Sequence, residues 1–187
     1  MKPAKFFAIC LILLVLLVVS LPAQASPRVN VYRLPMYGNI TDFTTDRNSS
    51  AWVADNASHA IYRVTMNGQI TTFALGSSRW PLGITDGPDG YIWFTDEIAN
   101  QIIKLWPYPY SPPLVYSLGQ TCSPKYIVSG ADGNLWFTNY RCPQIGRITT
   151  LGNIQMFPAD YGTELVRDTS GYLCFEIYTG TETVKIV

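Results

Sequence analysis

Short apolar runs alternate with turn-forming residues along this chain, and one such stretch occurs twice. Residues 87–90 (Gly-Pro-Asp-Gly) lead into the apolar run Ile92-Trp93-Phe94, and residues 130–133 (Gly-Ala-Asp-Gly) lead into Leu135-Trp136-Phe137. Asp-Gly favours a tight turn in which the glycine has a positive φ, and the bulky residues that follow favour a strand packed on both faces. Each stretch therefore predicts a turn followed by a buried strand.

The same order of apolar runs recurs along the chain and defines four units. They span about residues 37–73, 81–118, 124–157 and 164–187. Positions 52, 93 and 136 hold tryptophan and position 174 holds cysteine in the same place, so the spacings are 41, 43 and 38 residues. A repeat of about 40 residues with four short strands and no helix is typical of a propeller blade. A sandwich of unrelated hairpins is the alternative, but a sandwich does not require the same turn and strand at a fixed period.

Residues 29–35 alternate like a strand although they precede the first unit, whereas the fourth unit has only three strands. A propeller avoids an unpaired edge by pairing a strand from one terminus into the blade at the other terminus. We therefore expect an all-β propeller of about four four-stranded blades, the last closed by the N-terminal strand. The alternative is a partial propeller that completes a larger ring by dimerisation.

The first 25 residues have the pattern of an export signal. Lys2 and Lys5 precede an apolar run over residues 6–19, and Ala23-Gln24-Ala25 fits a cleavage site. An uncleaved membrane anchor is the alternative. We therefore expect residues 26–187 to form the propeller domain of a secreted, periplasmic or cell-surface protein.

The charge of the chain argues against two classes of partner. Without residues 1–25, the 13 basic residues fall to 11 against 13 acidic residues, a formal net charge of −2. Nucleic acids and anionic membranes bind concentrated basic patches, which this sequence lacks. Neither is expected as a partner once the signal has been removed.

Two cysteines fall in loops that the repeat places at one rim of the third unit. Cys122 precedes the first strand of that unit, and Cys142 lies between its second and third strands. In an exported protein we expect a disulfide between them. Cys174 is expected to be a small core residue. No CxxC pattern is present and the only histidine, His59, lies in another unit, so metal binding by these cysteines is not expected.

The motifs of the repeat together resemble the streptogramin B lyase (virginiamycin B lyase) family. They are Pro-x-x-Ile, Gly-Pro-Asp-Gly-x-Ile-Trp-Phe-Thr-Asp, Asn-x-Ile-x-Lys/Arg and Gly-x-Ile-x-x-Phe, and the likeness covers about residues 29–187. NHL-type propellers are the neighbouring family. The resemblance implies a β-propeller fold, although lyases of this family have seven blades and the repeat here has four.

The resemblance also implies a chemistry. Lyases of this family open an ester-linked cyclic peptide antibiotic by elimination, using Mg²⁺ near the channel mouth and a histidine as acid or base. In this sequence the slots of the family histidines hold Leu82 and Lys125, whereas Glu97 matches the family glutamate. Candidates for a rearranged catalytic set are Glu97, Lys125, His59 and Glu164. Glu97 is also the candidate metal ligand, and Mg²⁺ is expected as a cofactor only if this lyase chemistry holds.

Aromatic and polar side chains converge on the rim formed by these loops. Such a surface suits a sugar, peptide or protein ligand through ring stacking and hydrogen bonds. The alternative is that the tyrosines merely cap the blades. The candidate ligand-binding residues are Trp80, Glu97, Asn100, Tyr126, Tyr140, Arg141 and Tyr178.

Two functions therefore remain open. The first is an exported, non-catalytic or degenerate lyase-like propeller that binds a small molecule, peptide, glycan or protein without a cofactor. The second is a metal-dependent carbon–oxygen lyase that opens streptogramin B-type cyclic depsipeptides. Histidine readily transfers a proton near neutral pH, but neither of the two family slots contains one. The sequence therefore favours the first function.

Overall fold

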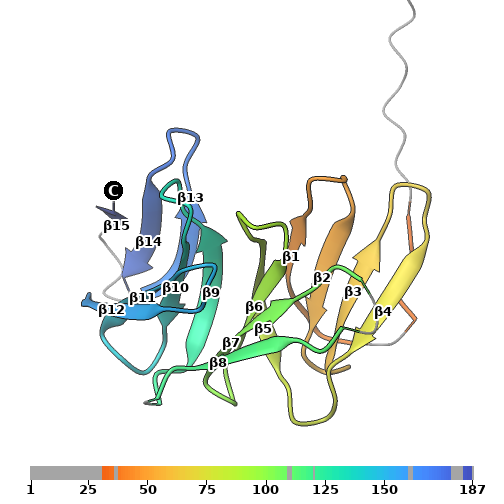
Figure 1. Ribbon diagram of the computed structural model, residues 1–187, viewed down its shortest axis with the longest axis horizontal. Helices are drawn as coiled ribbons and strands as arrows, with labels where there is room; N and C mark the ends of the chain where they lie inside the picture. Colours follow the sequence, from red (N-terminus) through yellow and green to blue (C-terminus); the bar gives the residue numbers. More distant parts are fainter. Residues whose placement is uncertain are drawn as a thin grey trace, which may run out of the picture. The chain divides into compact units, whose positions relative to one another are not determined.

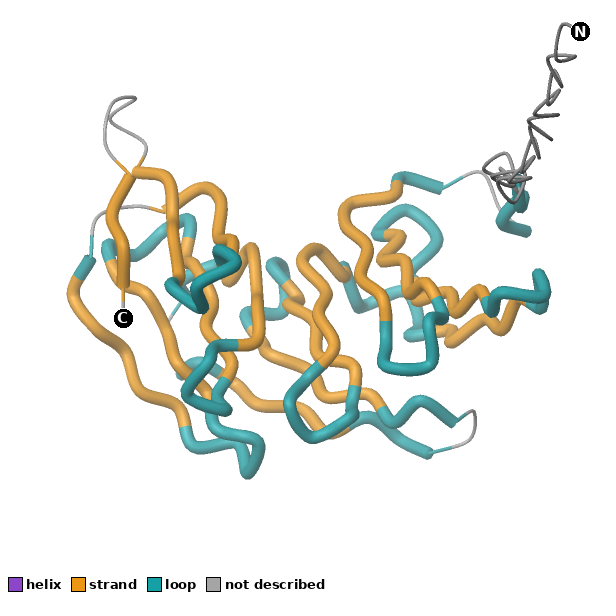
Figure 2. Tube along the Cα trace, turned by 90° about the horizontal axis from the view of Figure 1, so that it is seen from above, coloured by secondary structure: helices purple, strands orange, loops and turns teal. Residues whose placement is uncertain are grey.

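The computed structural model describes residues 31–35, 38–108, 111–119, 121–159, 162–177 and 183–186. Tyr32–Val187 forms one compact unit. The described residues contain β-strands and no helix, as Figure 2 shows. Among them there is consequently no helix that could cross a membrane. The all-β prediction is confirmed, whereas the predicted signal, residues 1–25, lies outside the described residues.

The strands form four antiparallel sheets, one for each repeat of the sequence, and we call these sheets blades 1 to 4 (Figure 1). Blade 1 contains β1 (Ile40–Thr45), β2 (Ala51–Asp55), β3 (Ala60–Val64) and β4 (Ile70–Ala74). Blade 2 contains β5 (Pro81–Asp86), β6 (Ile92–Asp96), β7 (Gln101–Leu105) and β8 (Leu114–Ser117). Blade 3 contains β9 (Pro124–Ser129), β10 (Leu135–Asn139), β11 (Gln144–Ile148) and β12 (Ile154–Pro158). Blade 4 contains β13 (Gly162–Arg167), β14 (Leu173–Ile177) and β15 (Thr183–Ile186).

The recurring Asp-Gly stretch forms the turn between the first two strands of a blade. In blade 2 the Gly87 N–H donates to the Tyr91 carbonyl at 2.7 Å, and Gly90 has φ 79°. Gly133 adopts φ 75° at the same place in blade 3. Glycine takes this conformation with less strain than other residues, so the Asp-Gly sequence favours the turn.

In blades 1 to 3 the tryptophan after this turn contacts a neighbouring aspartate and a cationic side chain. In blade 1 the Trp52 indole N–H donates to Asp46 Oδ2 at 2.9 Å, and the Arg63 guanidinium lies 5.5 Å from the ring centroid. The same arrangement recurs as Asp89, Trp93 and Lys104 in blade 2 and as Asp132, Trp136 and Arg147 in blade 3. We call this arrangement the tryptophan clasp.

Each tryptophan also packs against the following blade, and the core is therefore built between blades. Trp52 and Ile61 of blade 1 share a buried cluster with Ile84, Phe94 and Ile103 of blade 2. A second cluster contains Trp93 and joins blade 2 to blade 3, and a third contains Trp136 and joins blade 3 to blade 4. The first strands follow one another in the order β1, β5, β9 and β13, each in contact with the next. This succession of face-to-face sheets is the propeller arrangement that the repeat predicted.

The predicted closure by the N-terminal strand is wrong for the described residues. Blade 4 consists of β13, β14 and β15, and residues 31–35 form no strand. Tyr32 lies on blade 1 instead, where its hydroxyl donates to the Met66 carbonyl at 3.3 Å and its ring occupies the space beside Gly68. Because the ring packs on the β3–β4 turn, this segment lies with blade 1 and does not add to blade 4. Residues 29 and 30 lie outside the described residues.

Candidate functional site

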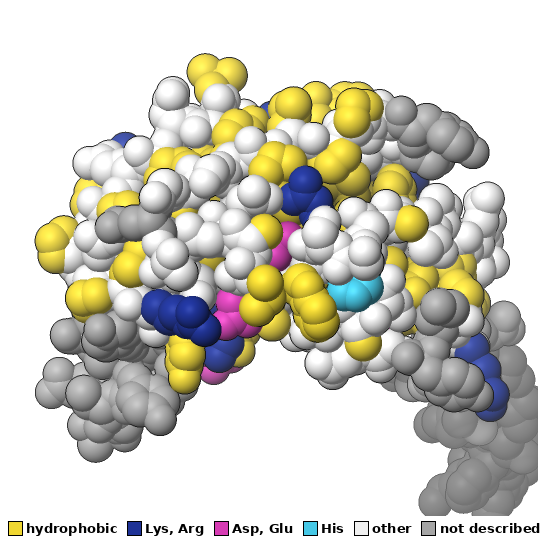
Figure 3. Space-filling model, turned by 90° about the horizontal axis from the view of Figure 1, so that it is seen from below, with side chains coloured by type: hydrophobic (Ala, Val, Ile, Leu, Met, Phe, Trp, Pro, Cys, Tyr) yellow, Lys and Arg dark blue, Asp and Glu magenta, His cyan; other side chains and the backbone are white. Residues whose placement is uncertain are grey.

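The loops before the first strand of a blade and the loops between its second and third strands share one face, which we call the rim face. In blade 3 the Tyr140 N–H donates to the Ser123 carbonyl at 3.0 Å, and the Arg141 N–H donates to the Cys122 carbonyl at 2.9 Å. Figure 3 looks onto the face of the molecule that carries the only histidine, His59, which lies in the equivalent loop of blade 1.

The predicted disulfide between Cys122 and Cys142 is present, with the two Cα atoms 4.9 Å apart. It joins the loop before β9 to the loop between β10 and β11. Lys125 and Tyr126 follow the first of these loops, and Tyr140 begins the second. The disulfide therefore fixes the segments that carry three of the predicted site residues.

Lys125, Tyr126 and Tyr140 come together on the rim of blade 3, and we call them the Lys125 cluster. The Lys125 ammonium lies 5.3 Å from the centroid of the Tyr126 ring and 5.6 Å from that of the Tyr140 ring. Both distances are within the range of a cation–π interaction. Tyr140 is 49% exposed and Tyr126 is half-buried, so ring surface remains open to a ligand.

The surroundings of Tyr126 keep its hydroxyl protonated. Burial raises the pKa of Tyr126 above its usual value of 10.0, and the negative charges of Glu164 and Asp42 raise it further. Strand pairing places Asp42, Tyr126 and Glu164 at the same position of β1, β9 and β13. A neutral tyrosine hydroxyl can both donate and accept a hydrogen bond, which suits recognition of a polar ligand.

The His59 ring is engaged by the loop that leads into blade 2. Its Nδ1 lies 2.6 Å from the Arg79 carbonyl oxygen, and the ring meets Trp80 edge to face with centroids 4.7 Å apart. Trp80 remains 39% exposed. The structure thus brings His59 together with Trp80 and places Lys125 with a different set of partners.

The remaining predicted residues have different surroundings. Asn100 bridges two blades, because its Oδ1 accepts hydrogen bonds from the Cys122 N–H at 2.9 Å and the Ser123 N–H at 3.1 Å. Glu97 is half-buried in the β6–β7 loop, and Arg141 is exposed beside the disulfide. Tyr178 lies outside the described residues.

The sequence analysis assigned no role to the residue that ends the second strand of blades 1, 2 and 3. Asp55 accepts hydrogen bonds through Oδ1 from the Asn39 and Ser58 N–H groups, and Asp96 accepts one from the Ala99 N–H. Asn139 takes the same place in blade 3 and donates to the Gln144 carbonyl. The signal was available in the sequence, since an Asp or Asn follows the tryptophan by three residues in each of the first three units.

The rim residues differ in chemistry from those that would hold the Mg²⁺ implied by the family resemblance. Mg²⁺ takes oxygen ligands, and most of its protein ligands are carboxylates. Lys125 instead brings a positive charge, and Leu82 brings no donor atom. Within the described part of the chain, no three His, Cys, Asp or Glu side chains are grouped so that they could hold a metal ion. The residues that the structure describes on this rim therefore do not fit Mg²⁺.

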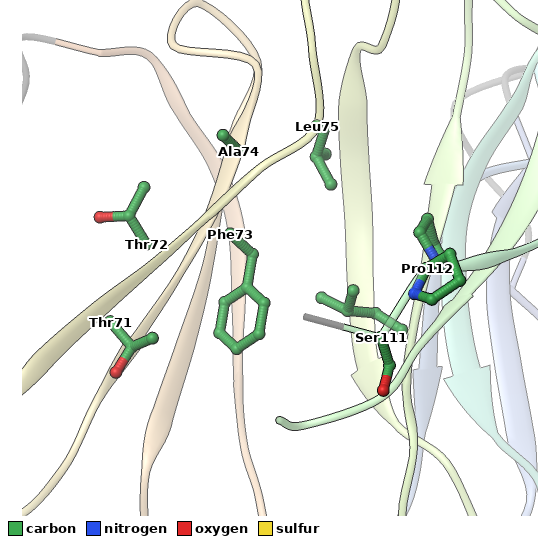
Figure 4. Close-up of a pocket in the computed structure, with 9 residues that line it drawn as sticks. Thr71, Thr72, Phe73, Ala74, Leu75, Ser111 and Pro112 are labelled. Atoms are coloured by element: carbon green, nitrogen blue, oxygen red, sulfur yellow. The ribbon is translucent and has the colours of Figure 1, made fainter. Parts of the chain in front are cut away.

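A separate cavity of about 590 Å³ lies between the outer strand of blade 1, β4, and residues of blade 2 that precede β8 (Figure 4). Its walls are residues 71–75 of blade 1 and, from blade 2, Leu105 and residues 111–113. Phe73 and Pro112 border it together with the hydroxyl-bearing Thr71 and Thr72. The predicted site residues described by the structure lie elsewhere, on the rim face.

Comparison with known proteins agrees with the resemblance that the motifs indicated. The sequence pattern of the virginiamycin B lyase family matches residues 22–163. Selenomethionine-substituted virginiamycin B lyase from Staphylococcus aureus is 30% identical with a TM-score of 0.75, over 83% of this chain and 55% of that chain. A catalytically inactive variant of the Staphylococcus aureus enzyme, solved with quinupristin, is 29% identical with a TM-score of 0.78, over 88% and 58% of the two chains.

A streptogramin B lyase structure is 26% identical with a TM-score of 0.76, over 83% of this chain and 54% of that chain. The chain thus spans between 54% and 58% of the length of these lyases. The comparison with curated proteins found no match. The likeness confirms both the resemblance and the β-propeller fold.

Proposed function

Because the chain belongs to the virginiamycin B lyase family of β-propellers, we propose that it is an exported propeller that binds a ligand on its rim face without opening a lactone. The observation that carries this proposal is the Lys125 cluster. A lysine occupies a family histidine slot there, and its ammonium lies beside two tyrosine rings. The disulfide between Cys122 and Cys142 supports export, since such bonds persist in oxidising compartments.

The chemistry of the Lys125 cluster indicates which ligands fit. The Tyr140 ring offers an exposed face for stacking, the Tyr126 hydroxyl can donate a hydrogen bond, and the Lys125 ammonium attracts an anion or a hydroxyl oxygen. Peptides and glycans combine ring or apolar surface with such acceptors. We propose that the ligand belongs to one of these two classes.

Binding can be tested with an array of soluble peptides and oligosaccharides, probed with the chain that lacks residues 1–25. We expect Tyr140→Ala to weaken binding of a retained probe by about tenfold or more, because the exposed ring is a central contact. Tyr108→Ala is the matched control, since Tyr108 is 60% exposed in the loop before β8. A probe whose affinity is the same for wild type, Tyr140→Ala and Lys125→Ala would contradict the proposal.

The second candidate function is the metal-dependent lyase, and family membership with retention of Glu97 favours it. Its test is incubation of the protein with Mg²⁺ and quinupristin, the molecule present in the related structure. Elimination breaks the ester C–O bond and moves a proton from carbon to a base, so the product keeps the mass of the substrate. A changed retention time and fragmentation pattern would reveal it. We expect no change, whereas opening that is abolished by EDTA and by Glu97→Gln would establish the lyase.

A further inference from the structure

The first strand of blade 1 exposes a position that is buried in the other three blades. Strand pairing places Phe43 of β1 at the same position as Ile84, Ile127 and Leu165. Those three residues are 3%, 2% and 3% exposed, because each packs against the preceding blade. Phe43 is 69% exposed. A large apolar side chain thus stands where the repeat normally receives another blade.

The exposure is concentrated on the inner strand of this face. Ile40, at the position of the buried Pro81, is 57% exposed. Farther out on the same face Val53 is half-buried and Tyr62 is fully buried. The free apolar surface of blade 1 is therefore centred on Ile40 and Phe43.

Blade 4 has the complementary free face. Val166 is 49% exposed, although its counterpart in blade 3, Val128, packs on the core between blades 3 and 4. Cys174, which the sequence predicted in the core, is only half-buried, whereas Trp136 at the same place in blade 3 is 7% exposed. We call the surface around Glu164, Val166 and Cys174 the trailing face, and the surface around Ile40 and Phe43 the leading face.

The two faces also match in their polar groups. Between blades 1 and 2 the Asp42 carboxylate crosses the interface and accepts a hydrogen bond from the Ile84 N–H at 2.9 Å. The counterpart of Asp42 on the trailing face is the exposed Glu164, and the counterpart of the Ile84 N–H on the leading face is the Phe43 N–H. In the single chain the Phe43 N–H donates to the carboxylate of its neighbour Asp42 at 2.8 Å.

We propose that the leading face of one chain docks on the trailing face of a second copy. The repeat itself argues for this occupant, because each free face has the apolar and carboxylate positions that the chain uses between its own blades. A second copy supplies both complementary faces at once. Under two-fold symmetry the two contacts are identical, and both copies use both faces in a closed dimer.

The first test is the mass of the chain without residues 1–25, measured by light scattering coupled to size exclusion. We expect a dimer for the wild type and a monomer for Phe43→Glu, whose dissociation constant should rise at least about 30-fold. Leu151→Glu is the matched control, because Leu151 is 84% exposed in the β11–β12 turn. Circular dichroism checks that the variants are folded. A monomeric wild type, or a dimer that Phe43→Glu leaves intact, would overturn the proposal.

Cysteine pairing tests the geometry independently. In a Cys174→Ser background, chains with Phe43→Cys and chains with Glu164→Cys should form a disulfide-linked dimer only when they are mixed. Either variant by itself should remain unlinked, because the two faces differ. Efficient linkage within one variant alone would show that like faces meet, and the proposed contact between unlike faces would then be wrong.

Discussion

His59 and Asn100 occupy the same turn position in blades 1 and 2, and each side chain bonds to the loop that leads into the next blade. Both residues have a positive φ, 49° and 56°. His59 reaches the Arg79 carbonyl through Nδ1, and Asn100 accepts the N–H groups of Cys122 and Ser123. The only histidine of the chain thus makes a contact between blades 1 and 2 at the position where an asparagine side chain links blades 2 and 3.

We predict that His59→Ala lowers the free energy of unfolding by about 1–2 kcal/mol, since it leaves the Arg79 carbonyl without this partner. His59→Asn should remain within about 0.5 kcal/mol of the wild type, because asparagine tolerates a positive φ and can donate to a carbonyl. Urea unfolding measures both values. Equal losses in the two variants would show that the ring packing on Trp80 matters more than the hydrogen bond.

The disulfide should contribute strongly to stability. Cys122 and Cys142 are 20 residues apart, and closing a loop of that size is worth about 3 kcal/mol by the chain-entropy estimate. We expect Cys122→Ser combined with Cys142→Ser to lower the free energy of unfolding by roughly this amount, with Cys174→Ser as the control. Alkylation of the unfolded chain lacking residues 1–25, without reductant, should modify one cysteine. Modification of three would contradict the bond.

The tryptophan clasp predicts a loss of stability on the acid side. Burial would raise the pKa of Asp46, but the hydrogen bonds from Trp52, Ser50 and Asn48 and the charge of Arg63 outweigh burial and hold it below the ordinary 3.8. A carboxylate with a lowered pKa stabilises the fold above pH 3.8, and this contribution is lost as the pH falls through the folded pKa.

Asp46→Asn should therefore destabilise the protein at about pH 7, and its difference from the wild type should shrink at about pH 2.5. Asp132→Asn should show the same dependence on pH. Burial would raise the pKa of Asp132, but hydrogen bonds from Asn134 and Trp136 and the charge of Arg147 outweigh burial and lower it. Urea midpoints at the two pH values measure the effect. A difference that does not change with pH would mean that the carboxylate charge plays no part.

Gly83 allows the first strands of blades 2 and 3 to approach each other closely. A Cβ atom at this position would lie 2.5 Å from the Lys125 carbonyl oxygen and 2.9 Å from the Tyr126 Cα. We predict that Gly83→Ala costs about 1–3 kcal/mol of stability, because backbone atoms must move apart. It should also weaken ligand binding at the Lys125 cluster. Ala74→Val, on an exposed strand position, is the control and should be close to neutral.

The sequence by itself determined the blade. Asp-Gly turns such as Gly87 to Gly90 require a positive φ, and runs such as Ile92 to Phe94 require burial on both faces, so their repetition specified the four-strand order of blades 1 to 3. The Cys122–Cys142 pair was predictable for the same reason, because the repeat fixes the face on which each loop lies. These features depend on neighbouring residues and on the period alone.

Only the tertiary structure decided what depends on contacts between blades. Tyr32 could equally have continued a strand of blade 4, but its ring packs beside Gly68 on blade 1. His59, a catalytic candidate by residue type, is engaged by the Arg79 carbonyl, whereas Lys125 meets the rings of Tyr126 and Tyr140. The exposure of Phe43 likewise could not be read from an alternating pattern that is the same in every blade. The repeat specifies the fold within a blade, whereas the exposure of a position depends on whether another blade packs on that face.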